Sequence, residues 1–526
     1  MESKMNPEEI GGITIDLEGL RDRIHPVTDV TPGTWDQLEA TWGGFYAVKT
    51  SGEVLHNDGM EDMTPPMLIR FDVLGGPMVV YEDVAGYVIS GDRMTLALST
   101  ETGAWLTYDR MFETLEELPT PMHMLEIDTT AEWAQILDEA WRLQRDFFWN
   151  PKLNGIDWDA MRSKYAERLD LIGSRDELDD LIGRMMSELE CSHAYIWQEG
   201  PPVRSAEYVP FAMLGADLAP HSEGYEITRI LPGRSWDEDG RSPLASSWLG
   251  IKEGDVILEI DGRPVDPNSN PWSMLDGIAG DTVRLVVMPK DKAEEILVVN
   301  APVVHDESRL RYNAWVDGNR EAVDAASDGR FGYLHLTDMD TEGLSQFGHQ
   351  FPGQGDKEGL VIDIRNNGGG FVSQLILDQL NQKVTGYDQP RHGSTMTYPQ
   401  HAFPGHMVVL MDQHSGSDGD IFPYMFREMG LGPLIGMRTW GGVVGIRSDK
   451  GAVDGGMTTQ PEYATWTLKD GWGIENYGVD PDIEVDNTPH DHLEGRDRQL
   501  ERAIEELERR TREMPVETPS PPAYPE

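Results

Sequence analysis

The sequence has 526 residues, which is enough for several domains that each bury a core of their own. Its net charge of −50 and isoelectric point near 4.5 argue against nucleic acid and anionic membranes as partners. The single cysteine, Cys191, excludes an intrachain disulfide framework and fits a reducing compartment. Because no apolar run approaches the about 18 residues of a membrane span, and residues 1–7 carry no apolar signal region, we expect a soluble cytoplasmic protein.

Short apolar segments separated by Gly- and Asp-containing turns occupy residues 10–122. They predict strands, and their rhythm resembles that of β-propeller blades. A segment of this length makes about two blades, whereas a closed propeller needs about four or more. We therefore expect a partial propeller, as at the end of a longer protein or in a lineage that has lost blades. The clearest predicted strands are 44–48, 67–73, 86–90, 94–98 and 104–108.

A helical subdomain is predicted for residues 123–205, because the apolar spacing there changes to that of amphipathic helices. Three helices are expected, starting near residues 129, 158 and 175. The third helix leads into a short polar stretch, residues 190–195, beside a strand. The expected N-caps of the three helices are Thr129 or Thr130, then Asp157, then Ser174, which forms a capping box with Glu177.

Residues 206–304 form a separate unit rich in strands. The string Leu249–Gly262 fixes a turn, a strand and a second turn together, and it resembles the core of bacterial PDZ domains. PDZ modules bind peptide C-termini by adding a strand to a sheet edge, and the loop at Leu214 and Gly215 is a candidate carboxylate-binding nest. The alternative is that this PDZ-like domain only packs against its neighbours.

An α/β pattern extends over residues 305–490. Continuous apolar segments at 331–336 and 359–364 predict buried parallel strands. The second strand ends in three glycines, Gly368 to Gly370, directly before a predicted helix. Glycines at a strand end let backbone N–H groups approach an anionic ligand closely, so an anion-binding turn is favoured over a merely flexible one.

The stretch Val408–Phe422 predicts a buried strand, a turn of small residues and a helix. A serine on such a turn, Ser417, presents its hydroxyl away from packed neighbours, close to N–H groups at the start of the helix. Acyl transfer needs both features, an exposed nucleophile and donors for the developing oxyanion. The alternative is a helix-capping serine followed by two acidic first-turn residues, Asp418 and Asp420.

The last segment, residues 491–526, is predicted to contain a charged helix over 491–512. Its apolar positions are Leu500, Ile504 and Leu507. The proline-rich tail that follows is predicted to be disordered.

Five motifs, taken in their order along the chain, resemble the tricorn proteases, self-compartmentalising serine peptidases of family S41 that are related to the tail-specific proteases. Each motif is weak by itself, and the shared order makes the resemblance specific. It extends over residues 12–490. The motifs are Ser192–Tyr195, the PDZ-like string, Asp363–Ser373, Gly416–Phe422 and Glu475–Asp482.

The resemblance implies a catalytic set of four side chains. Ser417 is the nucleophile and His193 its general base, while Ser192 and Glu475 orient the imidazole and stabilise its charged form. Taken singly, the last three have plainer interpretations: a polar residue near a strand end for His193, a surface or capping hydroxyl for Ser192, and a residue beside a turn for Glu475.

The resemblance also implies an oxyanion hole. Its donors are the backbone N–H groups of Asp418 and of a glycine in the 368–370 turn, for which Gly369 is preferred. The acidic residue that sets specificity in the family is not assigned, although Asp388 lies nearby in the sequence.

A serine–lysine dyad, as in tail-specific proteases, is not expected. Those enzymes carry the lysine in a Thr-Phe-Gly-Lys-Gly type of segment after the nucleophile. The comparable stretch here, Thr439–Val444, has glycine at that place, and the next lysine is Lys450. No cofactor or metal is expected either, because the acidic residues around Ser417 lack the spacing of an EF-hand loop.

The sequence thus predicts a multidomain α/β protein with partial propeller blades, a helical subdomain, a PDZ-like domain and an α/β serine peptidase core. The expected activity is that of a serine endopeptidase acting on short peptides or unfolded segments. By resemblance, the protein is a homo-oligomer, and hexamers occur in the family. Two alternatives are a non-catalytic peptide-binding scaffold and a processing protease that selects C-termini through its PDZ-like domain.

Overall fold

The structure is a computed structural model, and it divides the chain into two compact units, residues 1–127 and 128–526. Each unit is described by itself. The predicted β-rich segment begins at residue 10, so its first part lies outside the described residues, as do 518 and 524–526 of the tail. Among the described helices, none combines the length and apolarity needed to cross a bilayer. The described residues are 35–41, 44–49, 66–72, 77–100, 102–119, 126–197, 211–234, 240–278, 282–292, 294–447, 450–517 and 519–523.

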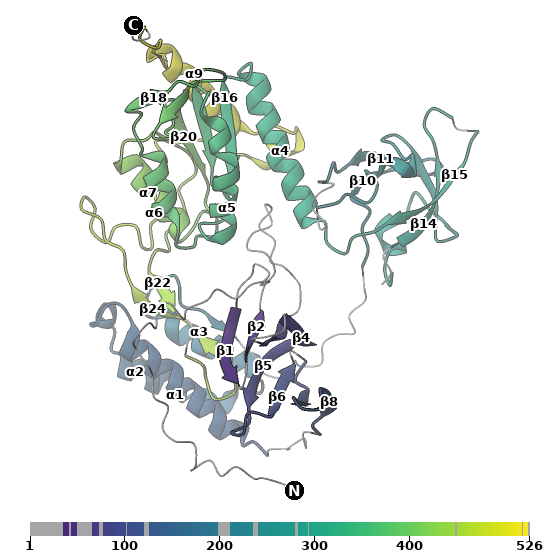
Figure 1. Ribbon diagram of the computed structural model, residues 1–526. Helices are drawn as coiled ribbons and strands as arrows, with labels where there is room; N and C mark the ends of the chain where they lie inside the picture. Colours follow the sequence, from purple (N-terminus) through teal and green to yellow (C-terminus); the bar gives the residue numbers. More distant parts are fainter. Residues whose placement is uncertain are drawn as a thin grey trace. The chain divides into compact units, whose positions relative to one another are not determined.

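In the first unit, the described residues form two four-stranded antiparallel sheets, each with its strands in chain order (Figure 1). Both sheets contribute to one apolar core that includes Tyr46, Leu68, Tyr87 and Leu96. A propeller blade is a four-stranded antiparallel sheet, and each of these sheets has that number of strands. The partial propeller therefore stays a prediction, and this unit is consistent with it. The strands are β1 (Trp35–Thr41), β2 (Gly44–Lys49), β3 (Met67–Asp72), β4 (Pro77–Glu82), β5 (Val84–Ile89), β6 (Thr95–Thr100), β7 (Trp105–Asp109) and β8 (Thr114–Glu117).

The second unit begins with three packed helices, α1 (Thr129–Phe147), α2 (Trp158–Ala166) and α3 (Arg175–Ser187). Asp157 and Ser174 cap α2 and α3 as predicted. The predicted cap of α1, Thr129 or Thr130, is wrong. Asp128 is the N-cap, because its carboxylate reaches the N–H groups of Thr130 and Ala131 and the helix therefore starts at Thr129.

The PDZ-like domain is built on one antiparallel sheet in the order β10-β11-β12-β14-β15, with β13 paired to β12. Strand β10 lies at an edge of this sheet, next to the Leu214–Gly215 loop. Inward-facing residues such as Ile227, Ile257 and Leu285 fill its core. The strands are β10 (Ala216–His221), β11 (Gly224–Ile230), β12 (Val256–Ile260), β13 (Arg263–Pro264), β14 (Thr282–Met288) and β15 (Leu297–Pro302).

The α/β core has a five-stranded parallel sheet in the order β16-β17-β20-β21-β25. Its central strands are apolar throughout because helices cover both faces: α4 and α9 one face, and α5, α6 and α7 the other (Figure 1). The strands are β16 (Phe331–His335), β17 (Gly359–Asp363), β20 (His406–Met411), β21 (Leu434–Gly436) and β25 (Ile483–Glu484). The helices are α4 (Ser308–Ala326), α5 (Thr341–Gln350), α6 (Ser373–Leu380), α7 (Asp418–Glu428) and α9 (Arg498–Glu513).

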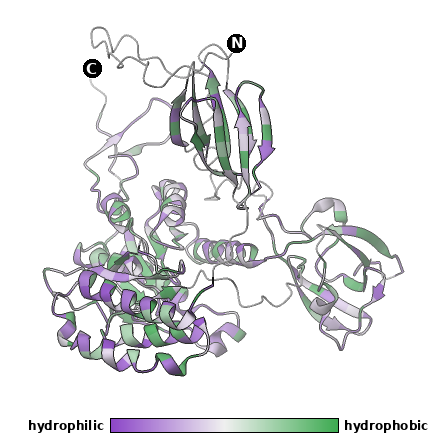
Figure 2. Cartoon of the chain, turned by 90° about the horizontal axis from the view of Figure 1, so that it is seen from below, coloured by the Kyte–Doolittle hydropathy of each residue, from purple (hydrophilic) through white to green (hydrophobic). Residues whose placement is uncertain are grey.

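The C-terminal helix differs from its predicted span of 491–512. A short helix, α8 (Pro489–Leu493), precedes α9, and Gly495 lies between them with a φ of +66°. That left-handed conformation ends α8, and Asp497 then caps α9 anew. Helix α9 places Leu500, Ala503 and Leu507 in the core. The helices of the chain carry both hydrophilic and hydrophobic residues, as expected for helices that cover a core (Figure 2).

Four short elements join the helical subdomain to the α/β core. Strand β9 (Ile196–Trp197) pairs antiparallel with β23 (Met457–Thr458), and β22 (Gly445–Arg447) pairs with β24 (Gln460–Tyr463). The segment that carries His193 is thereby attached directly to the core. A separate hairpin is formed by β18 (Gly386–Asp388) and β19 (Met396–Tyr398).

Candidate active site

Ser417 occupies the sharp turn between β20 and α7. Its φ of 58° and ψ of −121° are rarely adopted by a residue with a side chain, and such strain is typical of nucleophile turns. Ser417 stands at the N-cap position of α7, yet its side chain makes no capping hydrogen bond. The capping-serine alternative is therefore confirmed in position but not in the side-chain hydrogen bond that a cap makes. The residue as a whole is half-buried.

The glycine turn after β17 packs directly against Ser417. An ideal Cβ placed on Gly369 would lie 2.5 Å from the Cβ of Ser417 and 2.7 Å from the carbonyl oxygen of Gly416. The two turns are also joined by a hydrogen bond of 2.9 Å from the N–H of Gly416 to the carbonyl oxygen of Asn367. Only a glycine at position 369, with its φ of +93°, permits this approach.

The side chain of Asp418 is committed to structure. Its two carboxylate oxygens accept hydrogen bonds from the hydroxyl (2.6 Å) and the N–H (3.0 Å) of Ser373. Burial raises the pKa of this carboxyl group above its ordinary value. The backbone N–H of Asp418, in contrast, meets no acceptor among the described residues. It can therefore donate to an oxyanion beside Ser417.

The second predicted donor, the N–H of Gly369, is already engaged. It donates to the side-chain oxygen of Asn367 at 3.0 Å. The next amide, that of Gly370, has no acceptor within the part of the chain that the structure describes. Gly370 directly follows Gly369, the residue that packs against Ser417. Of the two N–H groups, that of Gly370 is therefore the one available to donate to an oxyanion.

Ser192, His193 and Glu475 form a hydrogen-bonded chain. The Ser192 hydroxyl donates to Glu475 Oε1 at 2.9 Å, and His193 Nδ1 lies 3.1 Å from the same hydroxyl oxygen. Since an ionised carboxylate only accepts, the Ser192 proton points to Glu475, and its oxygen accepts from Nδ1–H. This arrangement fixes the imidazole tautomer and leaves Nε2 without a proton, as a general base requires.

The imidazole of His193 is shielded from water, with 7% of the residue exposed. Burial lowers the pKa of His193 below its ordinary value, and the nearby Glu475 carboxylate opposes this effect in part. The imidazole stands edge-on to the ring of Trp440, with ring centroids 5.2 Å apart. The same ring covers Gly416, where an added Cβ would lie 2.8 Å from it. One tryptophan thus contacts both the predicted base and the nucleophile turn.

Thr459 anchors the segment that carries the imidazole. Its hydroxyl donates to the carbonyl oxygen of His193 at 2.7 Å and accepts from the N–H of Tyr195 at 2.7 Å. From the helical subdomain, the buried side chain of Gln144 donates to the carbonyl oxygen of Thr459 at 2.7 Å. These contacts, together with the β9–β23 pair, hold the base against the α/β core.

Glu475 is fixed at both oxygens. Its Oε1 also accepts from the N–H of Ser192 at 3.0 Å, and its Oε2 accepts from the N–H groups of Val443 at 2.7 Å and Val444 at 3.1 Å. These donors belong to the stretch that would carry the lysine of a serine–lysine dyad. Lys450 instead lies over the ring of Phe147, 4.3 Å from its centroid.

Cys191 adjoins this network but is not a candidate nucleophile. Its Sγ lies 3.6 Å from Glu475 Oε1. Burial, reinforced by the Glu475 carboxylate, raises the pKa of the thiol to about 12. The reactive thiolate is therefore scarcely populated at neutral pH.

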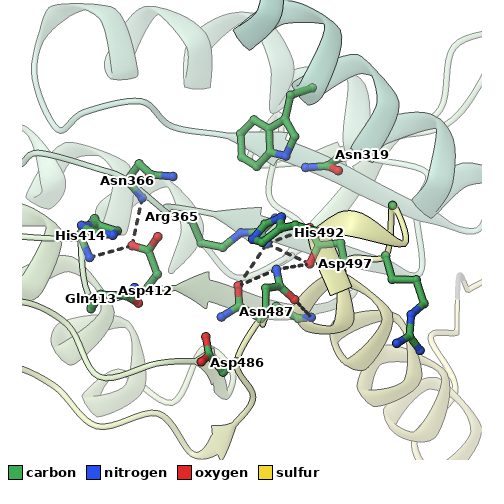
Figure 3. Close-up of a pocket in the computed structure, with 14 residues that line it drawn as sticks. Asn319, Arg365, Asn366, Asp412, Gln413, His414, Asp486, Asn487, His492 and Asp497 are labelled. Atoms are coloured by element: carbon green, nitrogen blue, oxygen red, sulfur yellow. Dashed lines mark hydrogen bonds and ion pairs between the residues drawn. The ribbon is translucent and has the colours of Figure 1, made fainter. Parts of the chain in front are cut away.

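A polar cavity of about 510 Å³ is lined by residues next to the turns that follow β17 and β20 (Figure 3). On its wall, Asp412 accepts from the N–H groups of Asn366 (3.0 Å) and His414 (3.1 Å), which ties the turn after β17 to the turn after β20. Buried Arg365 pairs there with Asp363 and Asp497. We interpret this network as a support for the turns. Among the described residues, no cluster of acidic, histidine or cysteine side chains is placed to hold a metal ion.

Three contributors to the site escaped the sequence analysis: Trp440, Thr459 and Asn367. An asparagine that follows a strand and precedes glycines favours local side-chain hydrogen bonds, so composition could have indicated Asn367. Trp440 and Thr459 act on residues far away in the sequence and leave no spacing signal.

Three family models match the chain: the tricorn protease C1 domain at residues 129–187, the tricorn protease PDZ domain at 212–303 and peptidase family S41 at 330–485. Tricorn protease homolog 1 of Streptomyces coelicolor is 38% identical over 96% of this chain and 48% of its own length. The tricorn protease of Thermoplasma acidophilum is 33% identical over 97% of this chain and 47% of its own.

A crystal structure of the tricorn protease superposes with a TM-score of 0.81 at 32% identity, covering 92% of this chain and 47% of the other. The chain therefore spans about half the length of the curated relatives that it matches. With its PDZ domain and S41 peptidase domain in the matching order, the chain belongs to the tricorn protease family.

Proposed function

We propose that the protein is a serine peptidase in which Ser417 attacks peptide bonds with His193 as its general base. The observation that carries the proposal is the hydrogen-bonded chain from Glu475 through Ser192 to His193, whose imidazole contacts the same tryptophan as the Ser417 turn. A neutral, oriented imidazole and a strained serine turn, both in contact with Trp440, are what acyl transfer needs.

In the proposed acylation step, Ser417 Oγ bonds to the substrate carbonyl carbon while its proton passes to His193 Nε2. The imidazolium that forms is stabilised by Ser192 and, through it, by the carboxylate of Glu475. His193 then gives the proton to the leaving amine as the peptide C–N bond breaks. Water, deprotonated by the same imidazole, attacks the acyl-enzyme, and the proton returns to Ser417 Oγ as the acid product leaves.

The negative charge on the carbonyl oxygen is received by backbone N–H groups. We assign one donor to Asp418, whose N–H is unengaged, and the second to the 368–370 turn. Because the Gly369 N–H is used by Asn367, the neighbouring amide of Gly370 is the proposed second donor. Removal of one such donor typically costs about 10²–10³ in kcat.

The substrates proposed are short peptides or unfolded segments, and the proposed assembly is a homo-oligomer, with a hexamer as the specific suggestion. Both proposals rest on membership of the tricorn protease family, whose relatives are about twice as long. The cytoplasm is the proposed location, supported by the use of a single cysteine in the chain.

An active-site-directed fluorophosphonate tests the nucleophile directly. We expect one adduct on the wild-type protein, located at Ser417 by mass spectrometry, and none on Ser417→Ala. Ser394→Ala, which removes an exposed serine outside the site, should label like the wild type. Labelling of Ser417→Ala at the wild-type level would overturn the assignment.

Hydrolysis of fluorogenic peptides tests the activity and the base. We expect Ser417→Ala and His193→Ala each to lower kcat by about 10⁴-fold or more, because members of such a set act as a unit. Equal rates in the wild type and both variants would end the assignment. A folded protein that neither labels nor hydrolyses peptides would favour the scaffold alternative.

A further inference from the structure

The PDZ-like domain carries a groove of about 480 Å³ along its edge strand β10. One wall is β10 itself, with Asp217 and Leu218, and the other is the short 3₁₀ helix Pro271–Met274, which contains Trp272 and Ser273. A peptide that extends the sheet of such a domain lies along this edge and places its C-terminal carboxylate at the loop before the strand. In this chain that loop contains Gly215.

At Gly215 the end of the groove is occupied by the side chain of Glu307, the N-cap residue of α4. Glu307 Oε1 accepts a hydrogen bond of 2.7 Å from the N–H of Gly215, whose φ is +67°. Glu307 Oε2 accepts from Arg311 Nε at 2.9 Å and Nη2 at 2.7 Å. Arg311 Nη1 also donates to Asp217 Oδ1 at 2.9 Å, so the guanidinium is used on three of its nitrogens.

We propose that Glu307 is a built-in substitute for a peptide C-terminus, which closes the PDZ-like domain to recognition of free carboxylates. A backbone N–H together with a guanidinium is the donor set that a carboxylate requires, and both members are taken. Glu307 is only 3% exposed, so it belongs to the packed structure. An incoming carboxylate would find no donor left at Gly215 and would meet a like charge at close range.

Further contacts near Glu307 attach the PDZ-like domain to α4 and the segment before it. Met213 and Val304 form a β-bridge with N–H···O bonds of 2.7 and 3.0 Å. Leu231 of the domain packs with Leu310 and Ala314 of α4. Glu307 lies within this interface, which indicates that the partner of the Gly215 loop is α4 and not a separate peptide.

This inference does not depend on the proposed peptidase activity. If Glu307 occupies the carboxylate-binding position, the PDZ-like domain does not select substrates by their C-termini. The processing-protease alternative, which requires that selection, is then excluded.

Peptide binding to the full chain tests the inference. The probe is a fluorescein-labelled octapeptide that ends in valine, prepared as the free acid and as the C-terminal amide, and it is measured by fluorescence anisotropy in the Ser417→Ala background. We expect Glu307→Ala to bind the free acid about tenfold or more tightly than the amide, because the Gly215 N–H and Arg311 become available. The Ser417→Ala parent should show no such preference.

Two further variants make the test decisive. Glu307 makes no side-chain capping bond to α4, whereas serine is a favourable N-cap residue, so Glu307→Ser should show the same preference even where Glu307→Ala is poorly folded. Glu321→Ala, which removes an exposed glutamate from the same helix, should behave like the parent. A preference of about tenfold for the free acid in the parent, or none in the folded Glu307 variants, would overturn the inference.

Discussion

The turn at Ser417 and the turn at Gly215 both present backbone N–H groups where an anionic oxygen can be received, one in the α/β core and one in the PDZ-like domain. At Ser417 the N–H of Asp418 has no acceptor among the described residues, and the carboxylate of Asp418 is turned away to Ser373. The N–H of Gly215, in contrast, already donates a hydrogen bond to Glu307 of the same chain. The N–H at the first site therefore remains available to a ligand, whereas the N–H at the second is already bonded to a side chain of the protein.

The difference lies in where each neighbouring carboxylate is held. Asp418 follows Ser417 directly, yet Ser373 supplies it with two donors and so keeps its charge away from the nucleophile turn. The Glu307 carboxylate, within the described part of the chain, is bound by Gly215 and Arg311. N–H groups without an acceptor can stabilise a charge that exists only in a transition state, whereas N–H groups that already donate to a side chain stabilise the folded structure.

Among the residues that support the proposed nucleophile and base, Gly369 is expected to give the largest effect when it is substituted. Gly369→Ala would place a Cβ 2.5 Å from that of Ser417 at a φ of +93°. We expect kcat/KM for peptide hydrolysis to fall by about 10³, with a loss of unfolding free energy of about 1–3 kcal/mol from backbone strain. Gly368→Ala is the matched control in the same turn, because an added Cβ there meets nothing within 4 Å. If both variants lose the same activity, the close approach of the two turns is not what matters.

Glu475→Gln tests the relay behind the open turn. The amide nitrogen of glutamine would face N–H donors, either of Val443 and Val444 or of Ser192, so one hydrogen-bond set must break. We expect kcat to fall on the order of 10²-fold with KM little changed, since the imidazolium loses its stabilisation in the transition state. Glu484→Gln, an exposed glutamate on β25, should leave kcat unchanged. A change confined to KM would contradict the assigned role.

The pH profile sharpens the comparison further. Because burial lowers the pKa of His193, the neutral base should persist below its ordinary pKa of about 6.5, and kcat/KM should be lost only as pH falls through that lowered value. Trp440→Ala exposes the imidazole to water, so its pKa should rise and the acid limb should move up by about 0.5 pH unit. Trp248→Ala, in the PDZ-like domain, should leave the limb in place. A downward shift in Trp440→Ala would show that the ring does not shield the base.

Thr459→Val should have the smallest effect. It preserves the shape of the side chain but removes both hydrogen bonds that fix the His193 segment. We expect kcat/KM to fall by about threefold to tenfold through looser positioning of the base, and the free energy of unfolding to fall by about 1–2 kcal/mol. Thr397→Val, in the β18–β19 hairpin, serves as the control for the substitution. An unchanged kcat/KM in a destabilised Thr459→Val would limit this residue to a structural role.

Much of the fold could be predicted because it follows from local spacing. The apolar run before Ser417 predicted β20, and the helical spacing of Ile421, Phe422, Met425 and Phe426 predicted α7. The errors are also local. Thr129 and Thr130 are both acceptable caps, but the carboxylate of Asp128 reaches two N–H groups, and Gly495 interrupts a segment whose charge pattern favoured one continuous helix.

The candidate site was predictable in its residue types and order, but not in its hydrogen bonds. Nothing near Gly369 in sequence decides whether its N–H faces a substrate or Asn367. Likewise, the pairing of Glu307 with Gly215 joins residues 92 positions apart, and only the packed domain creates it. Contacts of this kind depend on how finished elements meet, which spacing within one element does not encode.

The link between Ser192 and Glu475 spans 283 positions of the chain. During synthesis the imidazole and its hydroxyl emerge early, whereas the nucleophile follows much later and the carboxylate later still. A nascent chain therefore cannot complete the relay until almost the whole second unit has been made. Before residue 475 is present, a growing chain holds Ser192 and His193 without the carboxylate that orients them.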